Sequence, residues 1–584
     1  MPRCFNIVFF LFSFFLSSDV AFAQMSSEDY LNLVRQEQQQ NNNQIVLSLL
    51  NEAERLYPKD PNIFFERGSF YFNQRIYKNA LKDFLLAQKY SYDNTYTLYT
   101  NIAEIYNIQG KYEKAKEYYD ILIKDYPENE HVLANALWYY YKTLQIKEGI
   151  DIGEQIIQTW SSSSSINSML ALLYASLHNY EKAQGYYQRA VDISIQEGRY
   201  REASQTLYNQ AIFEEEFYQF ALSENLLQKA IELDNNPSSY RLMGELYLKK
   251  LLYWPAKEMI EISEDLEINE TETIKRDRTP LGRLVLAQLY LTFNQLQMAE
   301  KILSQVDKLN NQEWITSFGT NKDAYLSWQY SLQAILWQKH YLILKRSIHN
   351  SWAEWIQQKL QMIRASFFYL YYKSLQNAFA LKGANNMRHE QLLLPAYKDY
   401  LAISEEYPNA QRRFLDLSSA LELPFAPKAK PTYLTQKALL EKNTAWRDEA
   451  LQEFDPVYER YKKQVVLEKW LIQQPHTKDR LSLITQLYDL NRAAVAPFGL
   501  PVQLYIQGDE FYTKPLRKFL KQNLLLISNS LYILKITLNQ GTAEIILEKD
   551  AHELIQRRIE FTASAKGIAE LANRVLFYLY FPTE

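Results

Sequence analysis

A recurring small residue constrains the fold of this chain more than any other feature of its sequence. At seven positions, spaced 33 to 43 residues apart, a small or apolar residue is followed twelve residues later by a small one. The first of each pair is Gly68, Ala103, Leu137, Ala171, Ala211, Gly244 or Ala287, and the second is Ala80, Ala115, Gly149, Ala183, Ser223, Ala256 or Ala299. Only a minimal side chain lets two antiparallel helices cross closely, so the pattern predicts stacked helical hairpins.

Aromatic residues follow the same register. Three residues after each first position stand Tyr71, Tyr106, Tyr140, Tyr174, Glu214, Tyr247 and Tyr290. A ring one helical turn further on can fill the wedge between helices while its hydroxyl reaches a polar edge. Glu214 is the exception, and we expect it to face a Lys or Arg of a neighbouring helix. With only 14 Gly and 18 Pro in 584 residues, the composition also favours a helical solenoid over several globular domains.

This register resembles the tetratricopeptide repeat (TPR) family, whose unit is a helix-turn-helix of about 34 residues. The resemblance covers residues of about 45–420 and implies a mainly α protein, a TPR-like α-solenoid of antiparallel helix pairs. It also implies that the first helices line a concave groove suited to a peptide or a partner helix. Extrapolating the register places seven residues on that lining: Phe72, Asn73, Glu104, Asn107, Trp138, Tyr141 and Tyr208. Trp138 and Tyr141 have two interpretations, as anchors for a partner or as packing between repeats.

The first 23 residues have the pattern of a secretory signal peptide. Arg3 precedes an apolar run from Phe5 to Leu16, and Ala21-Phe22-Ala23 is a small-x-small cleavage site. The apolar run is too short to span a bilayer, and no later segment sustains one, so no membrane span is expected in the mature chain. The chain's single cysteine, Cys4, lies inside this segment. We therefore expect export to a bacterial periplasm or cell envelope.

The remaining boundaries follow from changes in periodicity. We expect the solenoid over 24–310, with a lone second helix at Leu49 to Leu56 before the array, and degenerate TPR-like repeats with long helices over 311–422. A Pro-rich linker over 423–432 and a helical segment over 433–495, broken at Pro475, come next. Residues 496–584 predict a small α+β domain. Its expected strands lie at 502–506, 531–538, 543–547 and 559–563, and its expected helices lie at 514–522 and 568–579. This order loosely resembles the small periplasmic domain of TolB-type proteins.

No pattern in the sequence indicates catalytic chemistry. The seven histidines are scattered, the predicted mature chain has no cysteine, and neither a phosphate-binding glycine loop nor a nucleophile elbow is present. We expect no catalytic residue, no metal and no cofactor. The 64 basic and 68 acidic residues nearly cancel, without the basic excess that nucleic-acid binding requires. The Lys-Asn-Asn-Lys-Arg set with which some TPR proteins clamp a C-terminal carboxylate is also not reproduced.

Two functional hypotheses remain. The first is a non-catalytic protein-interaction scaffold that binds other proteins or peptides in the concave groove, with the α+β domain as a second docking module. The second is an envelope ligand- or glycan-binding protein that uses the α+β domain, with the solenoid as a spacer. A hydrolase would need polar groups that converge from distant positions, which the sequence does not show.

Overall fold

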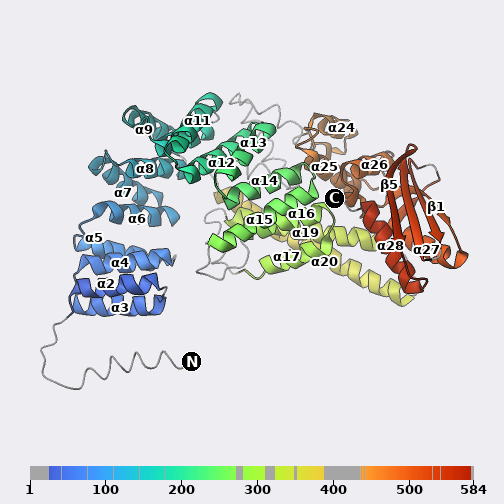
Figure 1. The fold of residues 1–584 in the computed structure, drawn as a ribbon, viewed down its shortest axis with the longest axis horizontal. Helices are drawn as coiled ribbons and strands as arrows, with labels where there is room; N and C mark the ends of the chain where they lie inside the picture. Colours follow the sequence, from blue (N-terminus) through green and yellow to red (C-terminus); the bar gives the residue numbers. More distant parts are fainter. Residues whose placement is uncertain are drawn as a thin grey trace, which may run out of the picture. The chain divides into compact units, whose positions relative to one another are not determined.

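The computed structural model describes residues 25–580 except 41, 75, 110, 144, 178, 271–279, 310–321, 347–351, 387–433, 436, 440, 529 and 540. The chain forms two compact units that divide between Glu128 and Asn129, and each is described by itself. The predicted signal peptide (1–23), the linker (423–432) and the repeat pattern at Ala396, Tyr400 and Ile403 lie outside the described residues. Figure 1 shows helical hairpins followed by one sheet near the C-terminus. The predicted class, a helical solenoid followed by a small α+β domain, is confirmed.

The first unit consists of three helical hairpins. They are α2 (Ser27–Gln39) with α3 (Asn43–Leu56), α4 (Pro61–Asn73) with α5 (Tyr77–Lys89), and α6 (Thr95–Ile108) with α7 (Tyr112–Asp125). The expected lone second helix is therefore wrong, because α2 completes a hairpin with α3. The sequence signal for α2 is a capping box, in which the Ser26 side chain accepts from the Asp29 N–H and the Asp29 carboxylate accepts from the Ser26 N–H.

A buried cation joins three helices of this unit. Arg67 of α4 donates from Nε and Nη2 to the two carboxylate oxygens of Asp83 on α5, at 2.7 and 2.9 Å. Its Nη1 donates to Asn51 of α3 at 3.0 Å and also to Glu54. Because a buried guanidinium is stable only when its donors are matched, this cluster fixes α3, α4 and α5 in one arrangement.

The second unit continues the hairpins. They are α8 (Glu130–Lys142) with α9 (Ile146–Thr159), α10 (Ser164–Ser176) with α11 (Tyr180–Gln196), α12 (Tyr200–Glu216) with α13 (Phe220–Leu233), α14 (Pro237–Lys249) with α15 (Tyr253–Glu270), and α16 (Pro280–Thr292) with α17 (Leu296–Val306). In each pair we call the earlier element the first helix and the later one the second helix. All seven predicted first positions lie on first helices, and all seven small positions lie on second helices.

The small residues lie where the helices cross. Ala80, Ala115, Ala183, Ala256 and Ala299 are fully buried, and so is Ser223. At Gly244 of α14, an added Cβ would lie 2.7 Å from Ile260 Cγ1 and 3.1 Å from the Ala256 carbonyl oxygen of α15. At Gly68 it would lie 2.7 Å from the ring of Phe84. The spacing of small residues thus reports real interhelical contacts, as the sequence predicts.

Two longer helices follow the seventh hairpin. They are α19 (Lys322–Arg346) and α20 (Trp352–Asn386), and they pack along each other. Trp337 of α19 stacks on Phe368 of α20 with ring centroids 4.7 Å apart. Long helices are what the sequence predicts here, whereas residues 387–422 of the predicted degenerate repeats lie outside the described part.

The C-terminal part begins with helices and ends with a sheet. Its helices are α24 (Thr444–Glu453), α25 (Arg460–Gln473), α26 (Arg480–Leu490) and the short η3 (Arg492–Val495), and Pro475 separates α25 from α26 as predicted. The later elements are β1 (Leu500–Gln507), α27 (Glu510–Asn523), β2 (Leu524–Leu526), β3 (Tyr532–Asn539), β4 (Thr542–Lys549), β5 (His552–Glu560) and α28 (Ala565–Tyr580). The predicted strand at 559–563 is misplaced, since β5 lies almost wholly before it, and β2 was not predicted.

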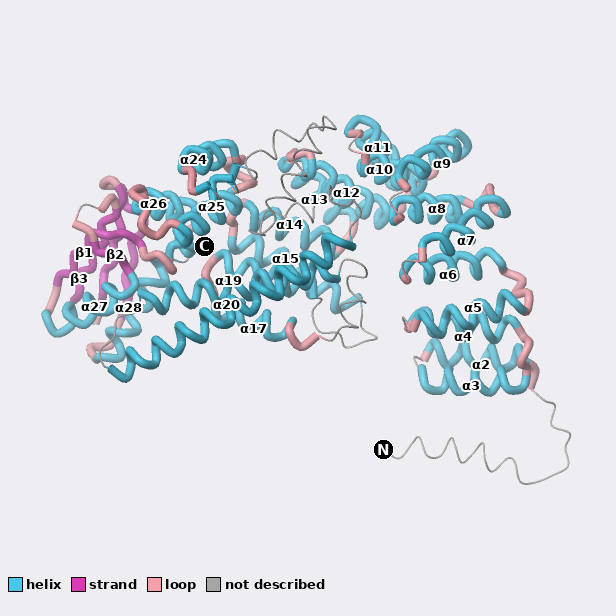
Figure 2. Tube along the Cα trace, turned by 180° about the vertical axis from the view of Figure 1, so that it is seen from behind, coloured by secondary structure: helices cyan, strands magenta, loops and turns pink. Residues whose placement is uncertain are grey.

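The sheet has the order β2-β1-β3-β4-β5. Figure 2 shows its strands in magenta. β1 pairs in parallel with both β2 and β3, whereas β3, β4 and β5 pair antiparallel. Along β3 the residues Tyr532, Leu534, Ile536 and Leu538 are buried and alternate with less buried ones. One face of the sheet is therefore covered, and apolar residues of α27 and α28 pack in the same core.

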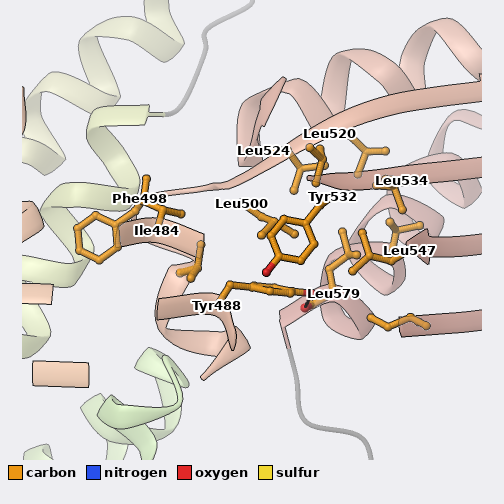
Figure 3. Close-up of a cluster of buried hydrophobic side chains, with 14 of the residues drawn as sticks. Ile484, Tyr488, Phe498, Leu500, Leu520, Leu524, Tyr532, Leu534, Leu547 and Leu579 are labelled. Carbon is orange, nitrogen blue, oxygen red and sulfur yellow. Dashed lines mark hydrogen bonds between the residues drawn. The ribbon is translucent and has the colours of Figure 1, made fainter. Parts of the chain in front are cut away.

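The core of this domain also includes helices that precede the sheet. Trp470 of α25 and Ile484 and Tyr488 of α26 belong to the same buried cluster as Leu500, Tyr532 and Leu579. The rings of Tyr488 and Tyr532 meet edge to face with centroids 5.0 Å apart (Figure 3). The Tyr488 hydroxyl donates to the Leu579 carbonyl at 2.9 Å. The helical segment and the sheet thus form one packed domain.

This domain is bound to the turns of the last three hairpins. Gln464 of α25 and Asn491 both donate to the Thr292 carbonyl at the end of α16, each at 3.0 Å. Lys339 of α19 donates to the Leu291 carbonyl and forms an ion pair with Glu468, at 3.0 and 3.1 Å. Both carbonyls lie at the end of α16, where the helix leaves acceptors without an intrahelical i+4 donor. The C-terminal domain satisfies that of Thr292 and, through Glu468, positions the Lys339 ammonium that donates to that of Leu291.

Candidate functional site

The predicted groove residues of the first unit are surface residues on first helices. Phe72 lies on α4, where its ring contacts Tyr77 and Phe84 with centroids 5.8 and 6.5 Å apart. Asn73 is exposed at the end of the same helix. On α6, Glu104 is exposed and Asn107 is half-buried. Phe72 therefore packs mainly inside its own hairpin, and the other three present polar groups to the surface.

In the second unit, Trp138 and Tyr141 form a stacked pair on α8. Their ring centroids are 5.3 Å apart at an interplanar angle of 25°, and the Trp138 side chain is 37% exposed. Residues three apart lie on the same face of a helix, which explains the stacking. The neighbouring Leu137 and Tyr140 are buried. The surface side of α8 therefore presents a stacked aromatic pair, and its place on a groove lining stays a prediction.

Tyr208 of α12 lies in a cluster of polar and aromatic side chains rather than in the open. Arg241 of α14 donates a hydrogen bond to its hydroxyl, and Glu245 is one helical turn further along α14. Tyr325 of α19 interacts with the same three residues. Burial raises the pKa of both Tyr208 and Tyr325, so the two hydroxyls stay neutral. Tyr208 is half-buried and its hydroxyl already accepts from Arg241, so it is a less accessible contact than the pair on α8.

The predicted groove residues of the second unit form two separate groups, namely the Trp138–Tyr141 pair on α8 and Tyr208 on α12. α10 contacts both α8, which carries the aromatic pair, and α12, which carries Tyr208. Leu172 and Ala175 of α10 stand at the repeat positions of Trp138 and Tyr141, and both are half-buried. The first helices α8, α10 and α12 therefore adjoin in sequence order, with the partly exposed aromatic pair on α8 and the half-buried Tyr208 on α12.

Sequence reasoning missed the partners of Tyr208, although the register contained two of them. Arg241 precedes Gly244 by three residues, as Tyr208 precedes Ala211, and Glu245 follows Gly244 as Trp138 follows Leu137. The same extrapolation would have placed both on the lining. Tyr325 had no such signal, because α19 lies beyond the regular repeat.

The expectation for Glu214 is wrong. This carboxylate is fully buried and accepts from the hydroxyl of Tyr180 at 2.8 Å, with Gln210 nearby, rather than from a Lys or Arg. Burial is the main cause of its raised pKa, and it raises the pKa of Tyr180 to about 12, with a contribution from Glu214. A tyrosine can replace a cation here because the carboxyl, once neutral, needs hydrogen bonds and no countercharge.

A second cluster of ionisable side chains forms a hydrogen-bonded network between neighbouring hairpins. Glu154 of α9 accepts from Tyr174, from Tyr186 at 3.2 Å and from Lys182 at 3.3 Å. The rings of Tyr174 and Tyr186 stack with centroids 5.7 Å apart. Every member is matched within the network, so it joins α9, α10 and α11 and leaves no group poised for chemistry.

The described residues contain neither a metal-binding cluster nor a membrane-spanning helix. Across the described ranges, no group of three His, Cys, Asp or Glu side chains is arranged to hold a metal ion. In the same ranges, no helix combines the length and the apolar character that crossing a bilayer requires.

Comparisons with known proteins identify the repeat. The family model described as tetratricopeptide repeat matches residues 96–124, which contain most of α6 and α7, and residues 164–196, which form α10 and α11. Both matches start within a first helix or at its beginning, in the register of Ala103 and Ala171. No curated protein matches the sequence.

Solved structures of repeat proteins are also similar to the chain. A tetratricopeptide repeat protein from Parabacteroides merdae is 17% identical, with a TM-score of 0.32, over 44% of this chain and 96% of the other. The human IFIT1 dimer with PPP-AAAA is 14% identical, with a TM-score of 0.34, over 76% of this chain and 96% of the other. Yeast Tom70 is 13% identical, with a TM-score of 0.24, over 80% and 92%.

The regular spacing of buried small residues, the hairpins that they join and the two family matches agree with one another. The chain contains tetratricopeptide repeats, arranged as an α-solenoid and followed by a small α+β domain.

Proposed function

We propose that this protein is a non-catalytic, exported scaffold that binds polypeptide partners on the first-helix surface of its repeats. The observation that carries the proposal is the stacked, partly exposed pair of Trp138 and Tyr141 on α8. Large aromatic side chains contribute most of the binding energy of protein interfaces, because they bury much area while losing few rotamers. Such a pair on the inner helix of a repeat is suited to anchor a peptide or a helix.

The surroundings of the aromatic pair indicate where on the repeats a bound polypeptide would lie. Tyr208 is half-buried and already hydrogen-bonded by Arg241, so we place the binding surface of this unit over α8 and α10. Leu172 and Ala175 give α10 a low, apolar surface there. A bound segment would place an apolar side chain against Trp138 and Tyr141 and continue over these smaller residues.

Composition supports a polypeptide over a nucleic acid as the partner. The formal net charge is −4, so the chain lacks the positive field that draws phosphate backbones. For the second hypothesis, a glycan-binding C-terminal domain, no observation on the described residues gives specific support.

Export is supported by the sequence of residues 1–23. A cleavable signal peptide would be removed after Ala23, so the protein recovered from its native cell envelope would begin at Gln24. N-terminal sequencing of that material tests the proposal. Recovery of the intact N-terminus from the cytoplasm would contradict export.

A crosslinking experiment tests partner binding at the aromatic pair. Trp138 is replaced by the photoreactive amino acid benzoylphenylalanine in the full chain, expressed in its native host. Trp254 provides a matched control, because it is also 37% exposed but lies on a second helix, α15. We expect light-dependent adducts to defined polypeptides from position 138 and not from position 254.

Alanine substitutions test whether the aromatic pair binds a partner or only packs between repeats. Alanine at Trp138 or Tyr141 should reduce capture of the crosslinked partner while leaving the helical circular dichroism unchanged. Equal adduct yields from both tryptophan positions, or capture lost only together with helical signal, would show that the pair serves packing between repeats.

A further inference from the structure

The outward side of α20 carries a row of exposed apolar side chains. Leu360, Ile363, Phe367 and Leu370 are 61%, 66%, 63% and 64% exposed, and we call these four residues the apolar stripe. They follow one another at steps of three, four and three residues. At 3.6 residues per turn they therefore lie within about 80° of arc on one side of the helix. Contiguous exposed apolar surface usually marks a contact site.

Aromatic side chains extend the apolar stripe at both ends. Trp352 and Trp355 precede it, Tyr371 follows it, and all three are exposed. From Trp352 to Tyr371 this surface is about 28 Å long at 1.5 Å per residue. Tryptophan and tyrosine are enriched where membranes meet water, because their rings are apolar and their polar atoms can stay hydrated. The residue types of this surface are thus those of a membrane interface.

The other side of α20 is fixed against α19, and Figure 1 shows the two helices running side by side. Gln358 donates to the Leu344 carbonyl of α19, and Ala365 is buried. Phe368 stacks on Trp337 of α19 with ring centroids 4.7 Å apart. These contacts set the rotation of α20, so the apolar stripe cannot turn inward. The helix is apolar on two sides, and α19 covers one of them.

Basic side chains flank the apolar stripe, and the acidic residue of α20 points away from it. At 3.6 residues per turn, Lys359 lies about 60° to one side of the centre of the stripe, and Arg364 lies about 80° to the other. Glu354, the only acidic residue of α20, lies about 160° from that centre. The Lys359 ammonium and the Arg364 guanidinium each lie 5.7 Å from a ring centroid, that of Trp355 and that of Phe368. These rings hold the two charges beside the stripe without neutralising them.

A helix with a tryptophan-containing apolar side between basic flanks is suited to lie in the plane of a membrane. Its apolar side chains enter the boundary between headgroups and acyl chains, and its Lys and Arg side chains meet anionic headgroups. We propose that the apolar stripe of α20 binds the surface of a bilayer that contains anionic phospholipids. In this arrangement Lys359, Arg364 and Lys373 contact lipid phosphates while Phe367 lies below them.

The same observations disfavour the other possible occupants. A second copy of this surface would bring the basic flanks together, which costs free energy. A folded polypeptide would need a groove that matches the stripe, because α20 packs mainly on α19 and so presents a ridge. A fluid bilayer adapts to a ridge and supplies the opposite charge along its whole length.

This inference concerns α20 and is independent of the proposed partner surface on α8 and α10. A protein that binds polypeptides at Trp138 could do so without touching a membrane, and α20 could bind a membrane without any partner on α8. The measurements below report on α20 alone, so the two proposals can fail separately.

An environment-sensitive label tests the proposal in the full chain. Cys4 is the only cysteine, so Cys4→Ser gives a cysteine-free background. The fluorophore NBD is attached to Phe367→Cys or, as the control, to Ile195→Cys at an exposed position of α11. With vesicles of phosphatidylcholine and phosphatidylglycerol, emission from position 367 should increase several-fold and shift to shorter wavelength. Emission from position 195 should stay unchanged, which also excludes an effect of the apolar N-terminal segment on the signal.

Removing the flanking charges should weaken binding to anionic vesicles. Each basic residue near an anionic surface strengthens binding about fivefold, so Lys359→Gln combined with Arg364→Gln should lower the partition coefficient roughly thirtyfold. Lys518→Gln combined with Lys521→Gln, at exposed positions of α27, is the matched control and should change it less than about twofold. Co-sedimentation of the proteins with vesicles measures both. Equal losses in the two double variants would show that the charges beside the stripe have no special role.

Polar substitutions in the apolar stripe test the apolar contribution. Ile363→Gln combined with Leu370→Gln should abolish the co-sedimentation and leave the helical circular dichroism unchanged, because both side chains are exposed. Ile195→Gln is the control and should bind as the parent protein does. Undiminished vesicle binding by the double variant would overturn the proposal.

The label at position 367 also identifies any other occupant, and each such result would overturn the proposal. Emission that is already high without vesicles would show that the chain itself covers the stripe. Emission that rises with protein concentration alone would indicate a second copy. Emission that rises with cell-envelope polypeptides but not with vesicles would indicate a protein partner, and an equal response to vesicles of phosphatidylcholine alone would contradict recognition of anionic lipid.

Discussion

At the scale of single residues, the small side chains at the hairpin crossings determine how closely the backbones approach. Gly244 shows this most directly, because even a methyl group would meet Ile260 and the Ala256 carbonyl of the facing helix. The alanines at the equivalent positions of α5, α7, α11 and α17 are fully buried for the same reason. Interiors packed to this density have no room for additional methylene groups.

Enlarging one of these residues should separate its hairpin. We expect Ala299→Leu to lower the free energy of unfolding by about 1–3 kcal/mol, since overpacking a fitted contact forces rotamer and backbone shifts. Met298 is its neighbour on α17 and is 43% exposed, so Met298→Leu should change the free energy of unfolding by less than about 0.5 kcal/mol. Urea unfolding followed by circular dichroism measures both. Equal effects of the two substitutions would contradict the crossing role of Ala299.

At the scale of the elements, α11 and α12 are joined by a buried carboxyl that has no cation beside it. Glu214 of α12 accepts from Tyr180 of α11, and its pKa is raised mainly by burial. A raised pKa in the folded state means that folding favours the protonated carboxyl. The stabilisation is complete below the unfolded pKa of about 4.5 and is lost as the pH rises through the folded pKa.

Glutamine at this position should remove that pH dependence. Glu214→Gln keeps an oxygen acceptor for Tyr180 and cannot ionise. We expect its stability to match the parent protein near pH 4 and to exceed it increasingly as the pH is raised towards 8. Thermal unfolding across this pH range measures the difference. Glu232→Gln, at an exposed position of α13, is the control and should show no such trend. A Gln variant that becomes less stable with rising pH would show that Glu214 is held as a carboxylate.

The helices were far easier to predict from sequence than the strands. A repeat offers the same evidence several times, so the positions of α4 to α17 follow from the spacing of small residues. The strand β5 offers little evidence, because only Ile555 and Ile559 of its residues are buried and its side chains are mostly polar. The three residues of β2 are too few to show an alternation.

The site residues were extrapolated from the repeat register, so the sequence could place them only where that register is regular. Trp138 and Tyr141 stand on the surface side of α8, because the repeat places them there. Tyr208 also interacts electrostatically with Tyr325 of α19, which has no place in the regular repeat, so the sequence does not show this neighbour. The function of these residues remains a proposal that the crosslinking experiment tests.

At the scale of the whole second unit, contacts between distant parts of the sequence bind the C-terminal domain to the repeats. Tyr458 donates to Glu224 of α13 at 2.8 Å and stacks on Phe220 with ring centroids 5.3 Å apart. Lys250 forms an ion pair with the same Glu224 at 3.0 Å. No local pattern predicts these contacts, because each joins residues that have no sequence relation to one another.

Removing the tyrosine should loosen this attachment. We expect Tyr458→Ala to destabilise the second unit by about 2 kcal/mol, the usual contribution of a hydrogen bond to a charged group together with lost ring contact. Amide hydrogen exchange should become faster in the turns near Tyr218 and Lys250. Val457→Ala changes the neighbouring, 47% exposed side chain and should leave exchange unaltered. Unchanged exchange in the Tyr458→Ala protein would show that the attachment depends on the contacts at Thr292 alone.

The hydrogen bonds made by the last turn of α28 determine when the C-terminal domain can fold during protein synthesis. The carbonyl of Leu579 accepts from Tyr488, and the hydroxyl of Tyr580 both accepts from the Leu500 N–H and donates to the Asn523 carbonyl. Because a chain is made from its N-terminus, the ribosome must release nearly all of α28 before these three elements can be joined. Until then the incomplete C-terminal domain exposes the apolar residues of its sheet, and chaperones that recognise such surfaces would bind it.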